Sequence, residues 1–236
     1  VVITGTNFGT ASLVTFNNTT TSTFSIDSPT QITVNVPSGA TTGKIKVTNP
    51  AGRASSVATF FVTPQITGFT PASGLAGTIV TINGTTFTGA SSVQFNGLAA
   101  TFSVNSSTKI TATLPSGATS GKISVATPGG TATSATSFMV LPTITSFTPK
   151  SGPVGTKVAI TGTAFTGVSK VKFNGKDAGS VTVDSSTQIT ASVNAGTTSG
   201  RITVTTSAGT ATSATDFTVI FPPTVTGFTP GGGVPG

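Results

Sequence analysis

Cysteine, histidine, glutamate, tryptophan and tyrosine are all absent from this sequence of 236 residues, and its only acidic residues are four aspartates. Histidine, glutamate and cysteine supply most of the general acids and bases, nucleophiles and transition-metal ligands that proteins use. Their joint absence removes most catalytic chemistry, so we expect no enzyme activity, no catalytic residues, no cofactor and no metal site. Without cysteine there are no disulfides, and the redox compartment stays open.

Charged residues are also scarce, and long apolar runs are missing. Eleven lysines and arginines against four aspartates give a formal net charge of +7, but the base density is low. A protein that tracks a phosphate backbone needs clustered bases, and one that stacks on bases or sugars commonly uses tryptophan or tyrosine. The sequence therefore disfavours nucleic-acid and carbohydrate recognition. No apolar run approaches the roughly 18 residues of a membrane span, so we expect no membrane span in this segment.

Threonine, serine, valine and glycine are abundant instead, in short runs separated by glycine and proline. β-Branched residues favour strands, while glycine and proline favour tight turns. The fold class that we predict is therefore all-β.

The sequence repeats itself about every 78 residues. One motif occurs as Ile-Thr-Gly-Phe-Thr-Pro at residues 66–71, Ile-Thr-Ser-Phe-Thr-Pro at 144–149 and Val-Thr-Gly-Phe-Thr-Pro at 225–230. This period is too long for a solenoid unit and suits one small sandwich domain. The recurring phenylalanines are expected to form its core. The marks that keep step are Gly5, Gly84 and Gly162; Phe8, Phe87 and Phe165; Phe16, Phe95 and Phe173; Gly43, Gly121 and Gly200; Phe60, Phe138 and Phe217.

The middle copy predicts seven strands, at residues 65–70, 78–83, 92–96, 99–104, 109–114, 121–127 and 131–140. Asn96-Gly97 suits the φ > 0 demands of a two-residue hairpin. Apolar residues such as Ile110 and Ala112 alternate with threonines, which describes sheets with one buried and one solvated face. Two such sheets packed face to face form a sandwich.

Residues 67–87, Thr-Gly-Phe-Thr-Pro-Ala-Ser-Gly-Leu-Ala-Gly-Thr-Ile-Val-Thr-Ile-Asn-Gly-Thr-Thr-Phe, resemble the opening strands of an IPT/TIG domain, as do their counterparts at 145–165. The later Phe-Asn-Gly hairpin and Ile-Thr alternation are similar to that family too, over essentially the whole chain. The resemblance implies tandem immunoglobulin-like β-sandwich domains, as in plexin-type receptors, Rel-type transcription factors, some starch-active enzymes and arrays on prokaryotic surface proteins. The family has no common catalytic residues, so none can be carried over.

The repeat divides the chain into domains at residues 1–62, 63–140 and 141–219, followed by 220–236. Aligning Gly5 with Gly84 leaves the first domain without its first strand, and residues 220–236 form a first strand with no domain behind it. One hypothesis is a window of three repeat lengths cut from a longer covalent array. In another, this strand fills the open groove of the next subunit's first domain, with Val225, Phe228 and Pro230 as candidate assembly residues. An isolated segment is the third alternative.

Four asparagines, Asn17, Asn18, Asn83 and Asn105, match the N-glycosylation pattern. A surface so poor in charge and rich in hydroxyls would be poorly protected against lateral association. Covalent glycans are therefore a hypothesis for this chain.

Three short polar residues, Asp27, Asn105 and Asp184, occupy equivalent places in the three copies. Each is expected to accept backbone N–H bonds in an Asx turn, because calcium needs several carboxylates together and these acids lie a domain apart.

Together these features predict a structural protein that forms an extracellular filament or surface stalk on a prokaryotic cell. Short linkers containing Pro64 and Pro142 are expected to restrict the orientation of neighbouring domains. The expected partner is the protein itself, through end-to-end and lateral assembly, with no nucleic acid. The alternatives are an adhesin whose binding residues lie in loops or in domains outside this segment, and a phage fibre or decoration protein.

Overall fold

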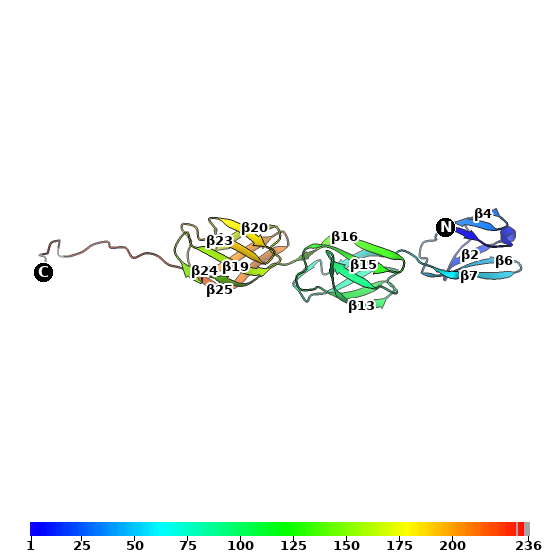
Figure 1. The fold of residues 1–236 in the computed structure, drawn as a ribbon, viewed down its shortest axis with the longest axis horizontal. Helices are drawn as coiled ribbons and strands as arrows, with labels where there is room; N and C mark the ends of the chain where they lie inside the picture. Colours follow the sequence, from blue (N-terminus) through cyan, green and yellow to red (C-terminus); the bar gives the residue numbers. More distant parts are fainter. Residues whose placement is uncertain (230, 234–236) are drawn as a thin grey trace. The chain divides into compact units, whose positions relative to one another are not determined.

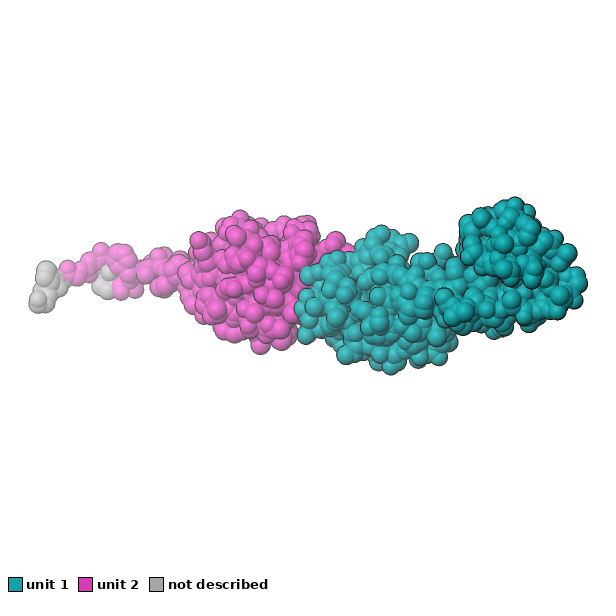
Figure 2. Space-filling view, turned by 45° about the vertical axis from the view of Figure 1, so that its right-hand side comes forward, with its two compact units in different colours: residues 1–72, 76–138 teal, residues 73–75, 139–236 magenta. Residues whose placement is uncertain are grey.

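The computed structural model describes residues 1–229 and 231–233. Among these residues there is no α-helix, and the only helical turn is the 3-10 helix η1 (Phe8–Thr10). The chain divides into two compact units, residues 1–72 with 76–138 and residues 73–75 with 139–236, which Figure 2 colours separately. The prediction of an all-β fold built from immunoglobulin-like sandwiches is confirmed.

The first sandwich, blue to cyan in Figure 1, has two antiparallel sheets. In one sheet β5 (Gln31–Val34) lies between β1 (Val2–Thr4) and β4 (Phe24–Ser28). The other has the order β3 (Thr19–Thr21), β2 (Leu13–Phe16), β6 (Gly43–Asn49), β7 (Gly52–Phe60).

The second sandwich has four strands in one sheet, in the order β13 (Thr101–Ser106), β14 (Lys109–Thr113), β10 (Ile79–Thr85), β8 (Gln65–Thr70). Its other sheet has the order β12 (Leu98–Ala99), β11 (Ser92–Phe95), β15 (Gly121–Thr127), β16 (Gly130–Val140), β9 (Ser73–Gly74). The short strand β9 is parallel to the end of β16, and the other pairs are antiparallel.

The third sandwich repeats this plan. One sheet has the order β17 (Thr143–Thr148), β19 (Lys157–Thr163), β23 (Gln188–Ser192), β22 (Val181–Ser185). The other has the order β18 (Ser151–Gly152), β25 (Gly209–Val219), β24 (Gly200–Thr206), β20 (Val168–Phe173), β21 (Lys176–Asp177). The peptide bonds Thr70–Pro71 and Thr148–Pro149 are cis.

One predicted strand of the middle copy, at residues 99–104, is in fact two. Strand β12 pairs with β11 in one sheet, whereas β13 pairs with β14 in the other. The chain changes sheets at Ala100, whose N–H donates to Val93 O at 2.9 Å. Alternating hydrophobicity continues across this crossover, so the sequence pattern gave no sign of it. The other six strands lie where they were predicted, to within about two residues.

The predicted hairpin at Asn96-Gly97 is present, with φ of 46° at Asn96 and 86° at Gly97. Both values are positive, as a type I′ turn requires. The asparagine also fills space above a glycine on the neighbouring strand, because a methyl group built on Gly121 would lie 2.3 Å from Asn96 Cγ. The amide nitrogen of Asn96 donates to Thr119 Oγ1 at 2.8 Å, which ties the hairpin to the adjacent loop.

The core of each sandwich contains an edge-to-face pair of phenylalanine rings, as the recurring phenylalanines predicted. The ring centroids lie 5.2–5.3 Å apart, within the range in which aromatic pairs stabilise a core. The pairs are Phe16 with Phe60, Phe95 with Phe138, and Phe173 with Phe217. In the second and third sandwiches both rings are buried, whereas Phe60 in the first is only half-buried.

A serine hydroxyl closes a β-bulge in every sandwich. In the second, the register of β15 and β16 shifts between Lys122 and Ser124, and the buried Ser134 hydroxyl fills the gap. It accepts the N–H of Ile123 at 3.0 Å and donates to Thr136 O at 2.7 Å. Ser56 and Ser213 make the same two bonds in their own domains.

Candidate functional site

The candidate assembly residues lie beyond the third sandwich. Residues 220–229 belong to no strand, and all of them are exposed. Val225 is 86% exposed and Phe228 is 79% exposed, values that are high for apolar side chains. Pro230, the third candidate, lies outside the described residues.

The four glycosylation candidates differ in their surroundings. The Asn17 amide nitrogen, which would carry the sugar, already donates to Thr41 Oγ1 at 2.9 Å. Asn105 is exposed, and its Oδ1 accepts from Thr111 Oγ1 at 3.1 Å. Asn18 and Asn83 are exposed, and within the described residues neither side chain makes a hydrogen bond. The amide nitrogens of Asn18, Asn83 and Asn105 are therefore more accessible acceptors than that of Asn17.

The Asx-turn prediction is wrong in the role that it gave to the acids. The Asp27 carboxylate accepts from the Thr33 hydroxyl at 2.6 Å, across the β4–β5 pair. The turn itself is held by the next residue, because the N–H of Thr30 donates to Ser28 Oγ at 3.2 Å. Asp27 lies at the register shift of this strand pair, one residue before the turn, so its carboxylate bonds across the pair instead. The other copies do the same through Asn105 with Thr111, Asp184 with Thr190, Ser106 with Thr108, and Ser185 with Thr187.

In the described part of the chain, charged side chains make two ion pairs and one contact with an aromatic ring. Lys172 pairs with Asp177 at 3.4 Å, and Arg201 pairs with Asp216 at 2.8 Å. The Lys150 ammonium lies 3.9 Å from the centroid of the Phe147 ring. The described residues hold no group of three or more potential metal ligands, and none of their helices is long and apolar enough to cross a membrane.

The first sandwich has an open groove between β1 and β7, with a volume of about 600 Å³. Apolar side chains line it, among them Ile3, Ile45 and Ala54. Ile3 and Ile45 are partly exposed and Ala54 is exposed. Their counterparts in the other two sandwiches are all at most 6% exposed. These counterparts are Ile82 and Ile160, Ile123 and Ile202, and Ala132 and Ala211.

The first strands of the later domains explain this difference. In the second sandwich the Phe69 ring of β8 lies 6.1 Å from Phe138, and in the third the Phe147 ring of β17 lies 6.4 Å from Phe217. Each core therefore contains a third ring beside its edge-to-face pair. Within the described residues, the Phe60 ring of the first sandwich pairs with Phe16 and with no third ring.

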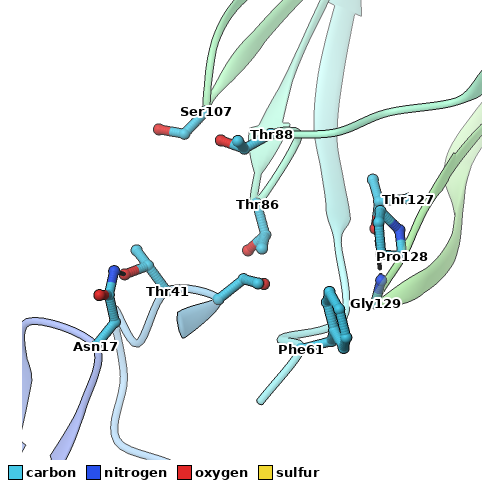
Figure 3. Close-up of a pocket in the computed structure, with 10 residues that line it drawn as sticks. Asn17, Thr41, Phe61, Thr86, Thr88, Ser107, Thr127, Pro128 and Gly129 are labelled. Atoms are coloured by element: carbon cyan, nitrogen blue, oxygen red, sulfur yellow. Dashed lines mark hydrogen bonds between the residues drawn. The ribbon is translucent and has the colours of Figure 1, made fainter. Parts of the chain in front are cut away.

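A second hollow, of about 270 Å³, lies within the first unit and is shown in Figure 3. Its lining consists of threonine and serine hydroxyls, the Asn17 amide, Pro128, Gly129 and the ring of Phe61, with no charged side chain. Phe61 is exposed, as are Phe221 and Phe228, and none of these three is among the phenylalanines named above as keeping step with the repeat.

Residues 64–140 and 142–219 each match the model of the IPT/TIG domain. Because these matches cover more than half of the sequence, the chain belongs to the IPT/TIG domain family. The predicted resemblance is thereby confirmed. No curated protein matches the chain.

Several solved structures have similar chains. One contains a xylogluco-oligosaccharide, with 25% identity, 92% of this chain and 56% of that one covered, and a TM-score of 0.39. The surface glycan-binding protein PbSGBP-B from Prevotella bryantii has 18% identity, coverage of 66% and 42%, and a TM-score of 0.44. SGBP-B of the Bacteroides ovatus mixed-linkage glucan utilization locus, in complex with a mixed-linkage heptasaccharide, has 16% identity, coverage of 88% and 60%, and a TM-score of 0.30. The chain spans roughly half the length of these proteins.

Proposed function

We propose that this chain is the spacer of a surface or extracellular binding protein. Its IPT/TIG domains position the ligand-binding part of that protein, which lies outside these domains. This is the adhesin alternative of the sequence analysis. The observation that carries the proposal is the way in which each linker is seated on the domain that follows it. A linker that is held against a domain restricts the position of the part attached to it, whereas a flexible linker does not.

The linker before the second sandwich is in close contact with one turn of that sandwich. A methyl group built on Gly129 would lie 2.2 Å from Val62 O, and one built on Gly130 would lie 3.7 Å from Thr63 Cγ2. Pro64, which follows, is buried. Proline fixes its own φ, so burying it adds stiffness to a linker that is already covered.

The linker before the third sandwich repeats the arrangement. A methyl group on Gly209, the counterpart of Gly130, would lie 3.0 Å from Leu141 Cδ2, and Pro142 is buried. The same turn of the domain thus receives the linker in both cases. This repetition supports a spacer in which every domain orders the connection before it.

Glycans are the first ligand class to test, since three of the similar structures are described with glycans or as glycan-binding proteins. The ligand-binding part would lie outside the present sequence, so this is compatible with the absence of tryptophan and tyrosine here. The same reasoning favours the outside of a bacterial cell as the location.

The spacer role is tested by deleting one whole repeat from the protein that carries this chain. Removal of residues 63–140 joins Val62 to Leu141, a junction that reproduces Val140 before Leu141. We expect the Kd for a soluble glycan to stay within about twofold, while capture of the same glycan on a surface falls as the reach shortens. The matched control is the 236-residue chain alone, which is expected to bind no glycan. Binding by that chain, or loss of soluble-glycan affinity on deletion, would overturn the proposal.

A second candidate function is the structural filament, built by end-to-end association. The observation that favours it is the tandem repeat, in which the second and third sandwiches each contact the linker that precedes them. Electron microscopy of the concentrated chain tests this function. Fibres with a regular axial repeat would support it, and isolated particles at every concentration would contradict it.

A further inference from the structure

One edge strand recurs at the same place in all three sandwiches and has a single neighbour in each. Within the described residues β13 pairs with β14 alone, and it lies at the margin of the second sandwich (Figure 1). Strands β4 and β22 occupy the same place beside β5 and β23. An edge strand leaves a row of backbone N–H and C=O groups without a strand partner. Each of these strands lies in the middle of its own repeat, so the open edge is a property of the domain.

The apolar side chains of β13 point toward the interior of the sandwich. Val104 lies opposite Ile110 in the β13–β14 pair, and Ile110 is fully buried. Side chains of directly opposed residues lie on the same face of a sheet, so Val104 faces inward, yet it is 40% exposed. Phe102, two residues earlier, lies opposite the buried Ala112 and is itself partly exposed. The inner face of β13 thus extends beyond the cover of the opposite sheet.

The same apolar pair occurs in the other two sandwiches. Ile26 is 41% exposed and Val183 is 45% exposed, whereas the residues opposite them, Ile32 and Ile189, are fully buried. Single exposed apolar residues scattered over a surface need no explanation, but these recur at one place in every domain. We call each pair an edge strip. The edge strips are Phe24 with Ile26, Phe102 with Val104, and Val181 with Val183.

No charge protects the edge strip of the second sandwich. Soluble proteins commonly protect an edge strand with lysine, proline, a bulge or an inward-pointing charge. Residues 92–113 contain one charged side chain, Lys109, and no proline. The register of the β13–β14 pair shifts between Val104 and Ser106, which leaves residues 101–104 as the regular part of the edge. A strand of about four residues can therefore add to it.

Strand β13 is its own complement when two copies meet antiparallel about Ser103. In that register Phe102 of one copy lies opposite Val104 of the other, and the two-fold symmetry repeats the pair. The corresponding registers of the other sandwiches, centred on residues 25 and 182, also set the two apolar residues of each edge strip against each other. One register thus satisfies all three domains.

This register also places no like charges opposite each other. Asp27 would lie opposite Thr23 of a second copy, and Asp184 would lie opposite Ser180, so each carboxylate meets a hydroxyl. Like charges directly opposite each other destabilise a strand pair. None of the eleven lysines and arginines lies in β4, β13 or β22, although the chain has a net charge of +7. A second copy of the chain is therefore electrostatically compatible with this edge.

We propose that β13 of one copy of this chain pairs antiparallel with β13 of a second copy, centred on Ser103, and that β4 and β22 offer the same kind of edge. The pairing joins two sheets into one continuous sheet. It also buries the two edge strips against each other, at a gain proportional to the apolar area covered. This inference does not depend on the spacer role.

The size of the contact predicts weak binding at each edge. Four residues extend about 14 Å along a strand, and the packed sheets of a sandwich lie about 10 Å apart. An edge of these dimensions covers roughly a few hundred Å², below the roughly 1,200 Å² of a specific, stable interface. One edge is therefore expected to give transient pairing, which three edges on one chain strengthen through effective concentration.

The register is tested with a cysteine at its centre, since the chain has no cysteine of its own. Ser103 is exposed, so Ser103→Cys should leave the fold intact. In the proposed pair the two copies of residue 103 lie directly opposite, with Cβ atoms about 4.5–5.5 Å apart, close to disulfide geometry. Under mild oxidation we expect a disulfide-linked dimer, in which mass spectrometry identifies residue 103 joined to residue 103.

The matched control is Thr101→Cys, at an exposed position on the same face of the same strand. In the proposed register the two copies of residue 101 are separated by four residues, about 14 Å, which is too far for a disulfide. Its dimer yield should be at least about tenfold lower. Equal yields, or no dimer from Ser103→Cys, would overturn the proposal. A disulfide from Ser103→Cys to a different protein of the source cells, with no self-linked dimer, would also overturn it.

The three edge strips are tested together in a chain that carries Ile26→Thr, Val104→Thr and Val183→Thr. Threonine also favours strands, but its hydroxyl makes the edge strip less apolar. Sedimentation of this chain over a range of concentrations should show self-association that is at least about tenfold weaker than in the unchanged chain, because every contact loses apolar area from both copies.

The control chain carries Val57→Thr, Ile79→Thr and Val154→Thr, which change one exposed aliphatic residue in each sandwich outside the edge strips. Its self-association should match that of the unchanged chain. Equal weakening in the two variant chains would indicate non-specific apolar contact and would contradict the proposal. An unchanged chain that stays monomeric at every concentration would contradict it as well.

Discussion

At the scale of the residue, hydroxyl groups make hydrogen bonds that hold bulges and strand pairs together in this chain, which has few charged groups. The buried Ser134 hydroxyl accepts one hydrogen bond and donates another. The Asp27 carboxylate accepts a hydrogen bond from a threonine hydroxyl. A hydroxyl can satisfy two backbone groups at a bulge without bringing a charge out of water, which costs far more. The backbone groups at these bulges thus have hydrogen-bond partners although the chain has few charged residues.

Ser134→Ala should lower the stability of the second sandwich by about 1–3 kcal/mol, since it leaves the buried Ile123 N–H and Thr136 O without their partner. Ser134 is only 2% exposed, so water cannot replace the hydroxyl. Hydrogen exchange of peptides from residues 121–140 measures the effect, and the unchanged third sandwich serves as the internal reference. Ser137→Ala, at an exposed position of the same strand, is the control and should have little effect. Equal protection in the two variants would refute the assigned role.

Residue-level roles were predictable from the sequence only where a local pattern defines them. The dipeptide Asn96-Gly97 predicts a turn, and the recurrence of Phe95 and Phe138 in the other copies predicts a core. The role of Ser134 depends on a bulge, in which one strand gains a residue against the other, and nothing local distinguishes it from the exposed Ser137. Asp27 was misassigned for the same reason, because its partner is set by register and not by neighbourhood in sequence.

At the scale of the element, the first strand of each domain completes the core. In the third sandwich β17 brings Phe147, which is 3% exposed, against the ring of Phe217. The ammonium group of Lys150 lies over the Phe147 ring. The repeat offset correctly aligned β1 with β10 and β19, which pair in the same way with β5, β14 and β23. The exposure of Ala54 in the groove was not predictable, because it depends on the residues that face Ala54 from the opposite sheet and not on its neighbours in sequence.

Phe147→Ala should destabilise the third sandwich by about 3–5 kcal/mol, the usual cost of removing a buried phenylalanine. Lys150→Ala is the matched change on the other side of the same contact, and it should cost about 0.5–1 kcal/mol, as expected for an exposed cation–π contact. Urea unfolding, followed through the hydrogen exchange of residues 157–163 and 188–192, measures the loss of stability in each variant. A Phe147→Ala loss no larger than that of Lys150→Ala would mean that β17 does not complete the core.

At the scale of the whole molecule, three copies of one sandwich differ in how completely their cores are covered. The first retains its edge-to-face ring pair but leaves the open groove beside it. Stability is distributed unevenly within proteins, and regions with fewer buried apolar contacts open more often. The three copies therefore form an internal comparison series with one repeated fold.

The first sandwich should open most readily in the monomeric chain. Hydrogen exchange of β5, β14 and β23, which occupy the same place in the three copies, gives the comparison directly. Amides of β5 should exchange at least about tenfold faster than those of the other two, because less apolar surface is buried around them. Equal exchange in all three strands would show that the open groove has no energetic cost.

The parallel pairing of β9 with the end of β16, and of β18 with the end of β25, bears on how these domains resist tension. The backbone bonds involved include Leu141 N–H to Gly74 O at 3.0 Å and Ile220 N–H to Gly152 O at 3.1 Å. Each pair joins a segment near the start of a domain to the strand that ends it. When the two ends are pulled apart, parallel strands are drawn in opposite directions along their own axes. Their hydrogen bonds are then loaded together in shear and cannot open one at a time, so each such domain contains a short mechanical clamp.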